Sequence, residues 1–199
     1  FDANLSFEIA SRFRKQNDLT TALKWANYAM LLWPTLHGAH IEAGRALSLM
    51  GKNEQAVIEY KLALKVNPLL INDIIDDFIK LKIPPTLQLL AIPADQSRSN
   101  YHLCVSLNKT AELTTQIRCA IQQLSIQGGE SHHYILALQI LILHDMTEQA
   151  QTWLASPGAA ILPDGEKQRL LAVLSQKNQG LDITMKHAFT QLSQLQQPK

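Results

Sequence analysis

This sequence of 199 residues contains few of the residues that interrupt helices, with only eight glycines and eight prolines. Most of them lie between apolar periodic segments, which favours helices joined by short connections over an all-β fold. No apolar run approaches the roughly 18–20 residues that a membrane-spanning helix needs. The longest run extends from Tyr134 to Leu143 and contains a glutamine, so we interpret it as a core helix. We therefore expect no membrane insertion in this segment.

An excess of charge of either sign is also missing, since 18 basic residues are balanced by 17 acidic ones and the two kinds are interleaved. A nucleic-acid-binding or anionic-membrane-binding protein usually carries a basic patch or stripe. The sequence therefore predicts neither partner. Apolar residues make up 46 % of the chain, which is enough for a substantial core and excludes a disordered chain.

Cysteine is scarce, and Cys104 and Cys119 do not have the spacing of metal ligands. Buried free thiols are the favoured interpretation, with a structural disulfide as the alternative. Among seven histidines, His132 and His133 are adjacent and would point about 100° apart on a helix. His37 shares a helical face with His40, but no carboxylate or thiolate follows at a ligand-like spacing. We predict no metal site.

Motifs for catalysis are absent as well: there is no H-E-x-x-H, no glycine-rich phosphate loop and no G-x-S-x-G elbow. The acidic cluster Asp73, Asp76 and Asp77 is best interpreted as a solvated helix face near a helix N-terminus, where the helix dipole favours negative charge. The sequence therefore predicts no catalytic residues and no cofactor.

What the sequence does contain is a repeat of 34 residues. Displacing the chain by that amount places Ala10 on Gly44, Ala22 on Ala56, Ala29 on Ala63 and Pro34 on Pro68. A fixed period of this size indicates stacked supersecondary units. Each unit is predicted to be a pair of helices, at 4–16 with 19–32 and at 37–50 with 53–66. The small residues would let the antiparallel helices cross closely, and the two prolines would end the second helices.

This pattern resembles the tetratricopeptide repeat family, with Gly44, Ala56, Tyr60, Ala63 and Pro68 in signature positions. The resemblance is clear over residues 3–70 and implies an all-α fold, a right-handed α-α superhelix of helical hairpins.

Beyond residue 70 the repeat becomes degenerate. We expect a further first helix within 69–83, a short second helix within 84–93, and later helices at 98–107, 110–126, 131–144, 146–155, 164–177 and 181–196. The predicted organisation is therefore two repeats at 1–70, a degenerate helix and linker at 71–96, and degenerate repeats that continue the solenoid at 97–199. The segment "TEQAQTWL" around Ala150 echoes "NEQAVIEY" around Ala56.

Members of this family generally bind partners through a concave groove lined by their first helices. Carried onto this chain, the resemblance implies the groove residues Asn4, Phe7, Ser11, Arg14, Ile41, Glu42, Arg45, Leu49, Asn72, Ile75 and Asp76. The mixture fits an extended or helical peptide held by apolar anchors and oriented by charged groups. We further expect that Arg45→Glu weakens partner binding with little change in melting temperature.

Chaperone-binding members of the family hold a peptide's terminal carboxylate in a clamp of Lys, Asn and Arg. The matching positions here include Glu42 and Asp76, which would repel a carboxylate. An Hsp70 or Hsp90 C-terminal tail is therefore disfavoured as the ligand.

The predicted function is a non-catalytic scaffold that binds a peptide or protein partner through the concave face. The alternative is a soluble periplasmic domain of a larger bacterial envelope protein, such as a membrane-bound polysaccharide polymerase, a pilin glycosyl ligase or an export factor. A sequence that starts without Met and is rich in glutamine is compatible with that alternative. Self-association into a homo-oligomer is a third hypothesis. The compartment stays open between periplasm and cytoplasm, with a slight preference for the periplasm.

Overall fold

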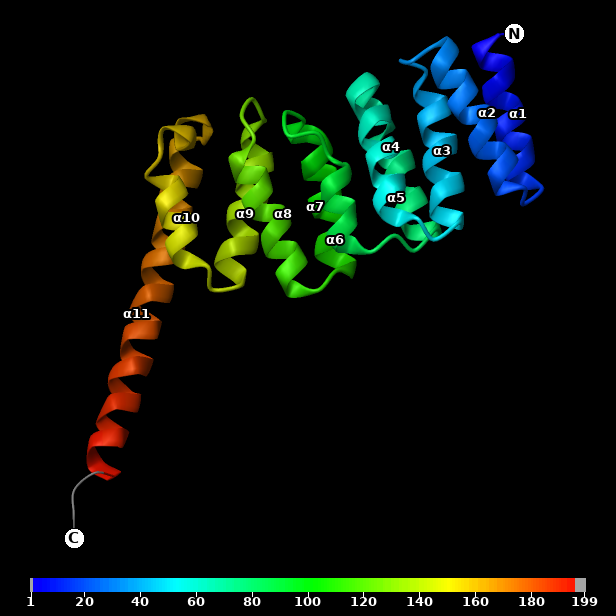
Figure 1. Cartoon of the computed structure of the whole chain (residues 1–199). Helices are drawn as coiled ribbons and strands as arrows, with labels where there is room; N and C mark the ends of the chain where they lie inside the picture. Colours follow the sequence, from blue (N-terminus) through cyan, green and yellow to red (C-terminus); the bar gives the residue numbers. More distant parts are fainter. Residues whose placement is uncertain (1, 196–199) are drawn as a thin grey trace. The chain divides into compact units, whose positions relative to one another are not determined.

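The structure is a computed structural model that describes the backbone of residues 2–195 and the side chains of residues 2–179. Within this range the chain forms eleven α-helices and short 3₁₀ turns, and no strand (Figure 1). The all-α prediction is therefore confirmed. The chain divides into two compact units, Phe1–Gly129 and Glu130–Lys199. The boundaries at residues 70 and 96 stay predictions.

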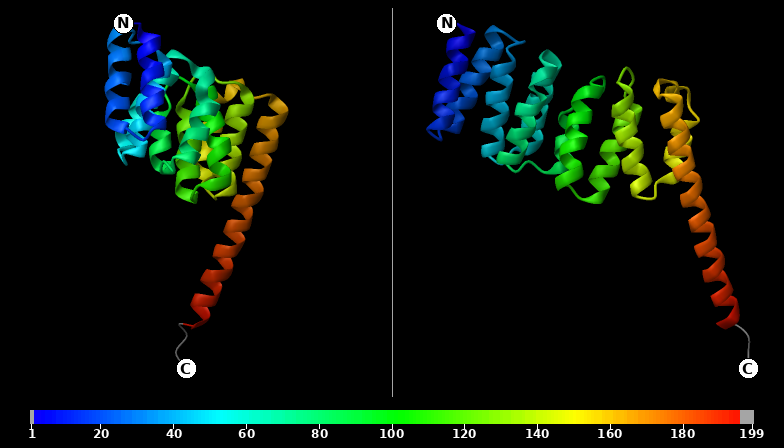
Figure 2. Two further views of the ribbon diagram at one scale, coloured as in Figure 1. Left: turned by 90° about the vertical axis from the view of Figure 1, so that its right-hand side faces the viewer. Right: turned by 180° about the vertical axis from the view of Figure 1, so that it is seen from behind.

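Two helical hairpins open the first unit. They consist of α1 (Ala3–Lys15) with α2 (Leu19–Leu32) and α3 (His37–Leu49) with α4 (Asn53–Val66). Their bounds agree with the four helices that the repeat predicts, to within one residue at each end. Helix α3 contacts both α2 and α4, so consecutive hairpins stack side by side (Figures 1 and 2).

The turns inside the hairpins have one common geometry. Asn17 and Gly51 occupy equivalent places in the repeat, and both have left-handed backbone, with φ of 64° and 76°. The next residue's amide then reaches back to the preceding helix, with 2.9 Å from the Asp18 nitrogen to the Phe13 oxygen and 2.9 Å from the Lys52 nitrogen to the Leu47 oxygen. This bond closes a helix in the Schellman manner and reverses the chain sharply.

Small side chains lie at the predicted crossings of the helices. Ala10, Ala29, Ala56 and Ala63 are each 0 % exposed. A side chain at these places larger than alanine would hold the helices apart, because native interiors are close-packed. The prediction that these residues permit close stacking is confirmed.

A shorter hairpin completes the pattern. Helix α5 (Ile71–Lys80) follows a 3₁₀ turn, Pro68–Leu70, and its second helix is reduced to α6 (Pro85–Gln88) and a 3₁₀ turn at Leu89–Ala91. Pro85 begins α6, since proline fits the first position of a helix and not its interior.

Helices α7 (Ser97–Thr110) and α8 (Leu113–Ser125) end the first unit and are joined by a disulfide between Cys104 and Cys119. The favoured prediction of free thiols is wrong. The two Cα atoms face each other 5.6 Å apart across the hairpin, within the range that a disulfide spans. A separation of 15 residues does not reveal this, because the pairing depends on where the turn at residues 111–112 falls.

The second unit contains α9 (Ser131–Leu143), α10 (Thr147–Leu154) and α11 (Asp164–Leu195). Tyr134 of α9 stacks on Trp153 of α10, with ring centroids 5.3 Å apart. Where the sequence predicts two helices, 164–177 and 181–196, α11 continues through residues 178–180, so the predicted break is wrong; residue 196 lies outside the described residues. A glycine inside a helix costs only about 1 kcal/mol relative to alanine, which does not end a helix by itself.

None of the helices in the described part of the chain is both long and apolar enough to span a membrane.

Candidate functional site

The first helices of the hairpins carry a line of alternating charges, centred on Glu42 of α3. The Glu42 side chain is only 3 % exposed. It accepts hydrogen bonds from Nε and Nη2 of Arg14 on α1, at 2.6 and 3.3 Å, and from Nη1 of Arg45 on its own helix at 2.8 Å. The guanidinium groups of Arg14 on α1 and Arg45 on α3 thus both contact one buried carboxylate.

The line continues to α5, where Nε of Arg45 donates to Oδ2 of Asp77 at 2.7 Å. The hydroxyl of Tyr60, on α4, lies 3.5 Å from the same oxygen. Arg14, Glu42, Arg45 and Asp77 therefore form a continuous row across α1, α3 and α5, which we call the ion row. It connects the first helices of three successive hairpins.

The surroundings of Arg45 and Tyr60 shift the pKa values of both side chains. Desolvation alone would lower the pKa of Arg45, but the hydrogen bonds and negative charges of Asp77 and Glu42 outweigh it and raise that pKa above its ordinary value. Burial raises the pKa of the Tyr60 hydroxyl, and the nearby negative charge of Asp77 raises it further. Arg45 stays charged and Tyr60 stays neutral at any physiological pH.

The charges of the ion row balance, yet its arginines keep capacity for a ligand. The side chains of Arg14 and Arg45 are 19 % and 29 % exposed. Each guanidinium has five N–H donors in a fixed plane. The bonds to Glu42 and Asp77 use two nitrogens of each arginine, so donors remain for a carbonyl or carboxylate at the surface.

The structure places the other predicted groove residues in several environments. Ile41 and Ile75 are buried, each 8 % exposed. Phe7 is half-buried and its ring lies against Gly38, where an added Cβ would be 3.1 Å from the ring. Leu49 is 46 % exposed. The remaining predicted residues are on the surface or half-buried: Asn4, Ser11, Asn72 and Asp76.

Asp76, which was predicted to line the groove, lies outside the ion row, and its neighbour Asp77 belongs to the row instead. The Asp76 side chain is 65 % exposed and lies 3.9 Å from Lys80, outside the ion row. Asp77 is buried at 7 % exposure, so the interpretation of all three aspartates as a solvated face is wrong for this one. A signal was present: Ile74 and Phe78 define the buried stripe of α5, and residue 77 lies beside Ile74 on that stripe.

Arg45 is held in two ion pairs, which bears on the predicted effect of Arg45→Glu. Because it bridges Glu42 and Asp77, Arg45→Glu would gather three carboxylates in one place. The geometry opposes the expectation that this substitution leaves the melting temperature nearly unchanged.

A second buried polar site joins the two hairpins at His40 of α3. Nδ1 lies 2.7 Å from Oε2 of Glu59 on α4, and Nε2 lies 3.0 Å from the carbonyl oxygen of Pro34, which follows α2. The hydrogen bond to Glu59 raises the pKa of His40, the effect of burial in the opposite direction being smaller. Both nitrogens face acceptors, so the doubly protonated imidazolium satisfies both contacts.

The sequence spacing indicated no carboxylate near His40, but the fold brings Glu59 of α4 next to it. No group of three or more His, Cys, Asp or Glu side chains suited to a metal ion occurs among the described residues.

No family model matches the chain, and no curated protein matches it in sequence. Solved structures similar to it include two of MamA. "MamA 41-end from Desulfovibrio magneticus RS-1" is 18 % identical, covers 76 % of this chain and 90 % of its own, and has a TM-score of 0.37. "MamA RS-1 ArsTM double mutant" is 17 % identical, covers 85 % and 94 %, and also has a TM-score of 0.37. At this level the similarity transfers no function, and the likeness to tetratricopeptide repeats rests on the hairpins themselves.

Proposed function

We propose that the chain is a non-catalytic protein-interaction module that binds a peptide or protein partner on the face built by α1, α3 and α5. The ion row is the observation that carries this proposal. It ties three successive first helices together through short charge-assisted hydrogen bonds. A face held in one arrangement before binding loses less conformational freedom when a partner arrives.

The chemistry of the face supports a peptide ligand. Arg14 and Arg45 keep N–H donors for backbone carbonyls or side-chain carboxylates of a partner. Leu49 offers an exposed apolar anchor, and Phe7 a half-buried one. Apolar anchors combined with a few fixed polar groups are typical of grooves that bind extended or helical peptides.

An Hsp70 or Hsp90 C-terminal tail remains disfavoured as the ligand, although Glu42 contributes less to this argument than the sequence suggested. The charge of Glu42 is already compensated by two arginines, so it repels a carboxylate less than an unpaired acid would. Asp76 still opposes a carboxylate, although Lys80 lies 3.9 Å from it. The face also has no grouping of Lys, Asn and Arg at the matching positions that would surround a terminal carboxylate.

The test is a selection of random peptides on the intact protein, followed by affinity measurements on variants. For peptides that bind this face, Leu49→Asp is expected to weaken binding at least tenfold. The matched control is Leu143→Asp, because Leu143 is also exposed, at 66 %, and lies on α9. If every selected peptide binds Leu49→Asp as tightly as the unmodified chain, the proposed face is wrong.

A second candidate function, a periplasmic domain of a larger envelope protein, is favoured by the disulfide between Cys104 and Cys119. Disulfides persist in oxidising compartments and are rare in the cytosol. The test is to unfold the protein from its native cells in the presence of a maleimide, without reductant, and to measure its mass. We expect no labelled cysteine. Two labelled cysteines would contradict the periplasmic placement.

A further inference from the structure

Helices α2 and α4 carry large apolar side chains that are exposed to solvent. On α2 and the residue after it these are Tyr28, Leu31, Leu32 and Trp33, exposed by 37, 75, 42 and 48 %. On α4 and the turn after it they are Ile58, Leu62, Val66 and Leu69, exposed by 57, 36, 41 and 76 %. We call these eight residues the outer apolar face.

Their spacing is regular. Ile58, Leu62 and Val66 are four residues apart and therefore form one stripe along α4. Tyr28 and Leu32 precede Leu62 and Val66 by 34 residues each, so they occupy the same places in the preceding repeat. Two of the three stripe positions are thus apolar on both second helices, whereas the place of Ile58 is taken by Lys24 on α2.

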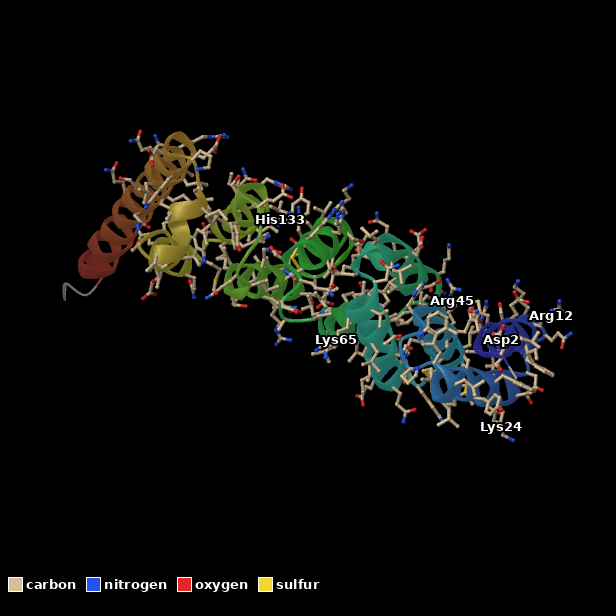
Figure 3. All side chains as sticks on the ribbon, turned by 90° about the horizontal axis from the view of Figure 1, so that it is seen from above. Asp2, Arg12, Lys24, Arg45, Lys65 and His133 are labelled. Atoms are coloured by element: carbon tan, nitrogen blue, oxygen red, sulfur yellow. A yellow bond between two sulfur atoms is a disulfide. The ribbon has the colours of Figure 1, made fainter. Side chains whose placement is uncertain are left out.

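The stripe is separate from the ion row. The ion row lies on first helices, whereas the outer apolar face lies on second helices. Figure 3 shows Lys24 of α2 on one side of the hairpin stack and Arg45 of α3 toward the other. A partner on one surface therefore does not occupy the other.

Positive charge borders the outer apolar face. Lys24 is the one charged residue in 19–35, and Lys61 and Lys65 are the only ones in 60–72. Of the carboxylates on α4, Glu59 is engaged by His40, and exposed Glu54 lies in the first turn, four residues before Ile58 on the line of the stripe. Lysines therefore border the C-terminal half of the α4 stripe, beside Leu62 and Val66.

We propose that the outer apolar face docks an amphipathic helix of a partner protein, one whose apolar stripe is bordered by Glu and Asp. A helix that presents apolar residues at i, i+3, i+4 and i+7 matches a stripe of four-residue spacing. Acidic residues beside that stripe meet Lys61 and Lys65, and this complementarity favours the partner over a basic helix. Exposed apolar surface bordered by polar groups is typical of interaction sites.

The experiment uses the full chain and two synthetic helical peptides with the same leucine stripe. One peptide has glutamates beside the stripe and the other has lysines at the same positions. We expect the glutamate peptide to bind at least tenfold more tightly, as measured by fluorescence anisotropy, and its affinity to fall as salt is raised.

Two variants locate the binding. Leu62→Ser with Val66→Ser is expected to weaken binding of the glutamate peptide at least tenfold. Ile79→Ser, at a more exposed apolar position (58 %) on α5, is expected to leave it unchanged. Lys61→Glu with Lys65→Glu is expected to reverse the preference between the peptides. Circular dichroism and melting temperature confirm that each variant is folded.

Other occupants give other results, and each would overturn the proposal. Equal affinity for both peptides would show that the face has no preference for an acidic partner helix. Concentration-dependent self-association that Leu62→Ser with Val66→Ser abolishes identifies a second copy of the chain. Binding to phosphatidylglycerol vesicles without binding to the glutamate peptide identifies a lipid surface. Because Leu49→Asp does not alter this face, the result is independent of the proposed inner site.

Discussion

At the scale of single residues, His40 is a buried titratable group at the junction of the first two hairpins. Its two nitrogens contact the Glu59 carboxylate and the Pro34 carbonyl, so it links α3 to α4 and to the end of α2. The neutral ring can donate to only one of these acceptors, and the other contact then brings two lone pairs together. Protonation of His40 therefore stabilises the junction of the first two hairpins.

We predict a pH dependence of stability from this residue. The pKa of His40 is raised in the folded state above 6.5, so its stabilisation is complete below pH 6.5 and is lost as pH rises through the folded-state pKa. The free energy of unfolding of the unmodified chain should therefore fall relative to that of His40→Gln as pH rises above about 6.5. Denaturant titrations of both proteins at several pH values measure this difference. A difference that does not change with pH would contradict the prediction.

Gly44 is fixed by the ring of Tyr60. A Cβ on this residue would lie 3.1 Å from two ring carbons, and the ring is fully buried and packed edge-on against Phe78 at 5.3 Å. The ring therefore has little room to move. Phe7 beside Gly38 is different, because it is half-buried and can shift.

We predict that Gly44→Leu destabilises the second hairpin by about 1–3 kcal/mol or more, the usual cost of overpacking a core. The control is Gly165→Ala on α11, where an added Cβ meets nothing within 4 Å and where alanine is expected to be neutral or slightly stabilising. Thermal and denaturant unfolding of both variants measure the effect. A Gly44→Leu variant as stable as the unmodified chain would show that the helices can separate at no cost.

At the scale of helices, the ion pairs of the ion row connect α1, α3 and α5. Buried ion pairs do not add much net stability, because desolvation offsets their attraction, but removing one partner leaves the other uncompensated. Arg45 is partner to both Glu42 and Asp77.

Arg45→Met is accordingly predicted to lower the free energy of unfolding by about 2–4 kcal/mol, somewhat below the cost for a fully buried pair because Arg45 is partly exposed. Arg12→Met, an exposed position on α1, should change it by less than about 0.5 kcal/mol. Urea unfolding monitored by circular dichroism separates the two. Equal small effects would mean that the row contributes nothing to holding the helices.

The disulfide ties α7 to α8 in a similar way. Its cysteines are 15 residues apart, and a loop of that size corresponds to about 3 kcal/mol in the chain-entropy description. The double variant Cys104→Ala with Cys119→Ala should lose about that amount of unfolding free energy, and dithiothreitol should destabilise the unmodified chain but not the variant. Insensitivity of the unmodified chain to the reductant would argue against the bond.

The sequence located helices both in the clear repeat and beyond it, as at Ser131–Leu143 and Thr147–Leu154, but it broke α11 wrongly. The four helices of residues 3–66 could be located because caps, small residues and terminal prolines recur together. Helix α11 could not, because a single glycine is a weak signal and its effect depends on what the helix contacts. Leu170 and Leu174 pack in the second unit, and Lys177 donates to the carbonyl of Ile142 at the end of α9. These contacts hold the helix just before residue 178.

At the scale of the whole molecule, the two compact units each contain fully buried apolar side chains. Tyr60, Phe78 and Leu103 belong to the first unit, and Leu138 and Leu141 to the second. A unit with its own core can fold alone.

We therefore predict that a chain ending at Gly129 retains its helical signal and a cooperative thermal transition. Circular dichroism of that shortened chain, compared with the full chain, is the measurement. A shortened chain without cooperative melting would show that the first unit depends on residues beyond Gly129.

By itself, the sequence determined the helical class, the 34-residue period and the small residues at the helix crossings, because these follow from local periodicity and from the shortest contacts within a hairpin. It also placed Arg14, Glu42 and Arg45 on the first helices. Only the tertiary structure decided that these three bond to one another, that Asp77 rather than Asp76 joins them, and that the cysteines are paired. Such contacts depend on the rotation of each helix against its neighbour, and that rotation is set by packing between hairpins, which no single stretch of sequence contains.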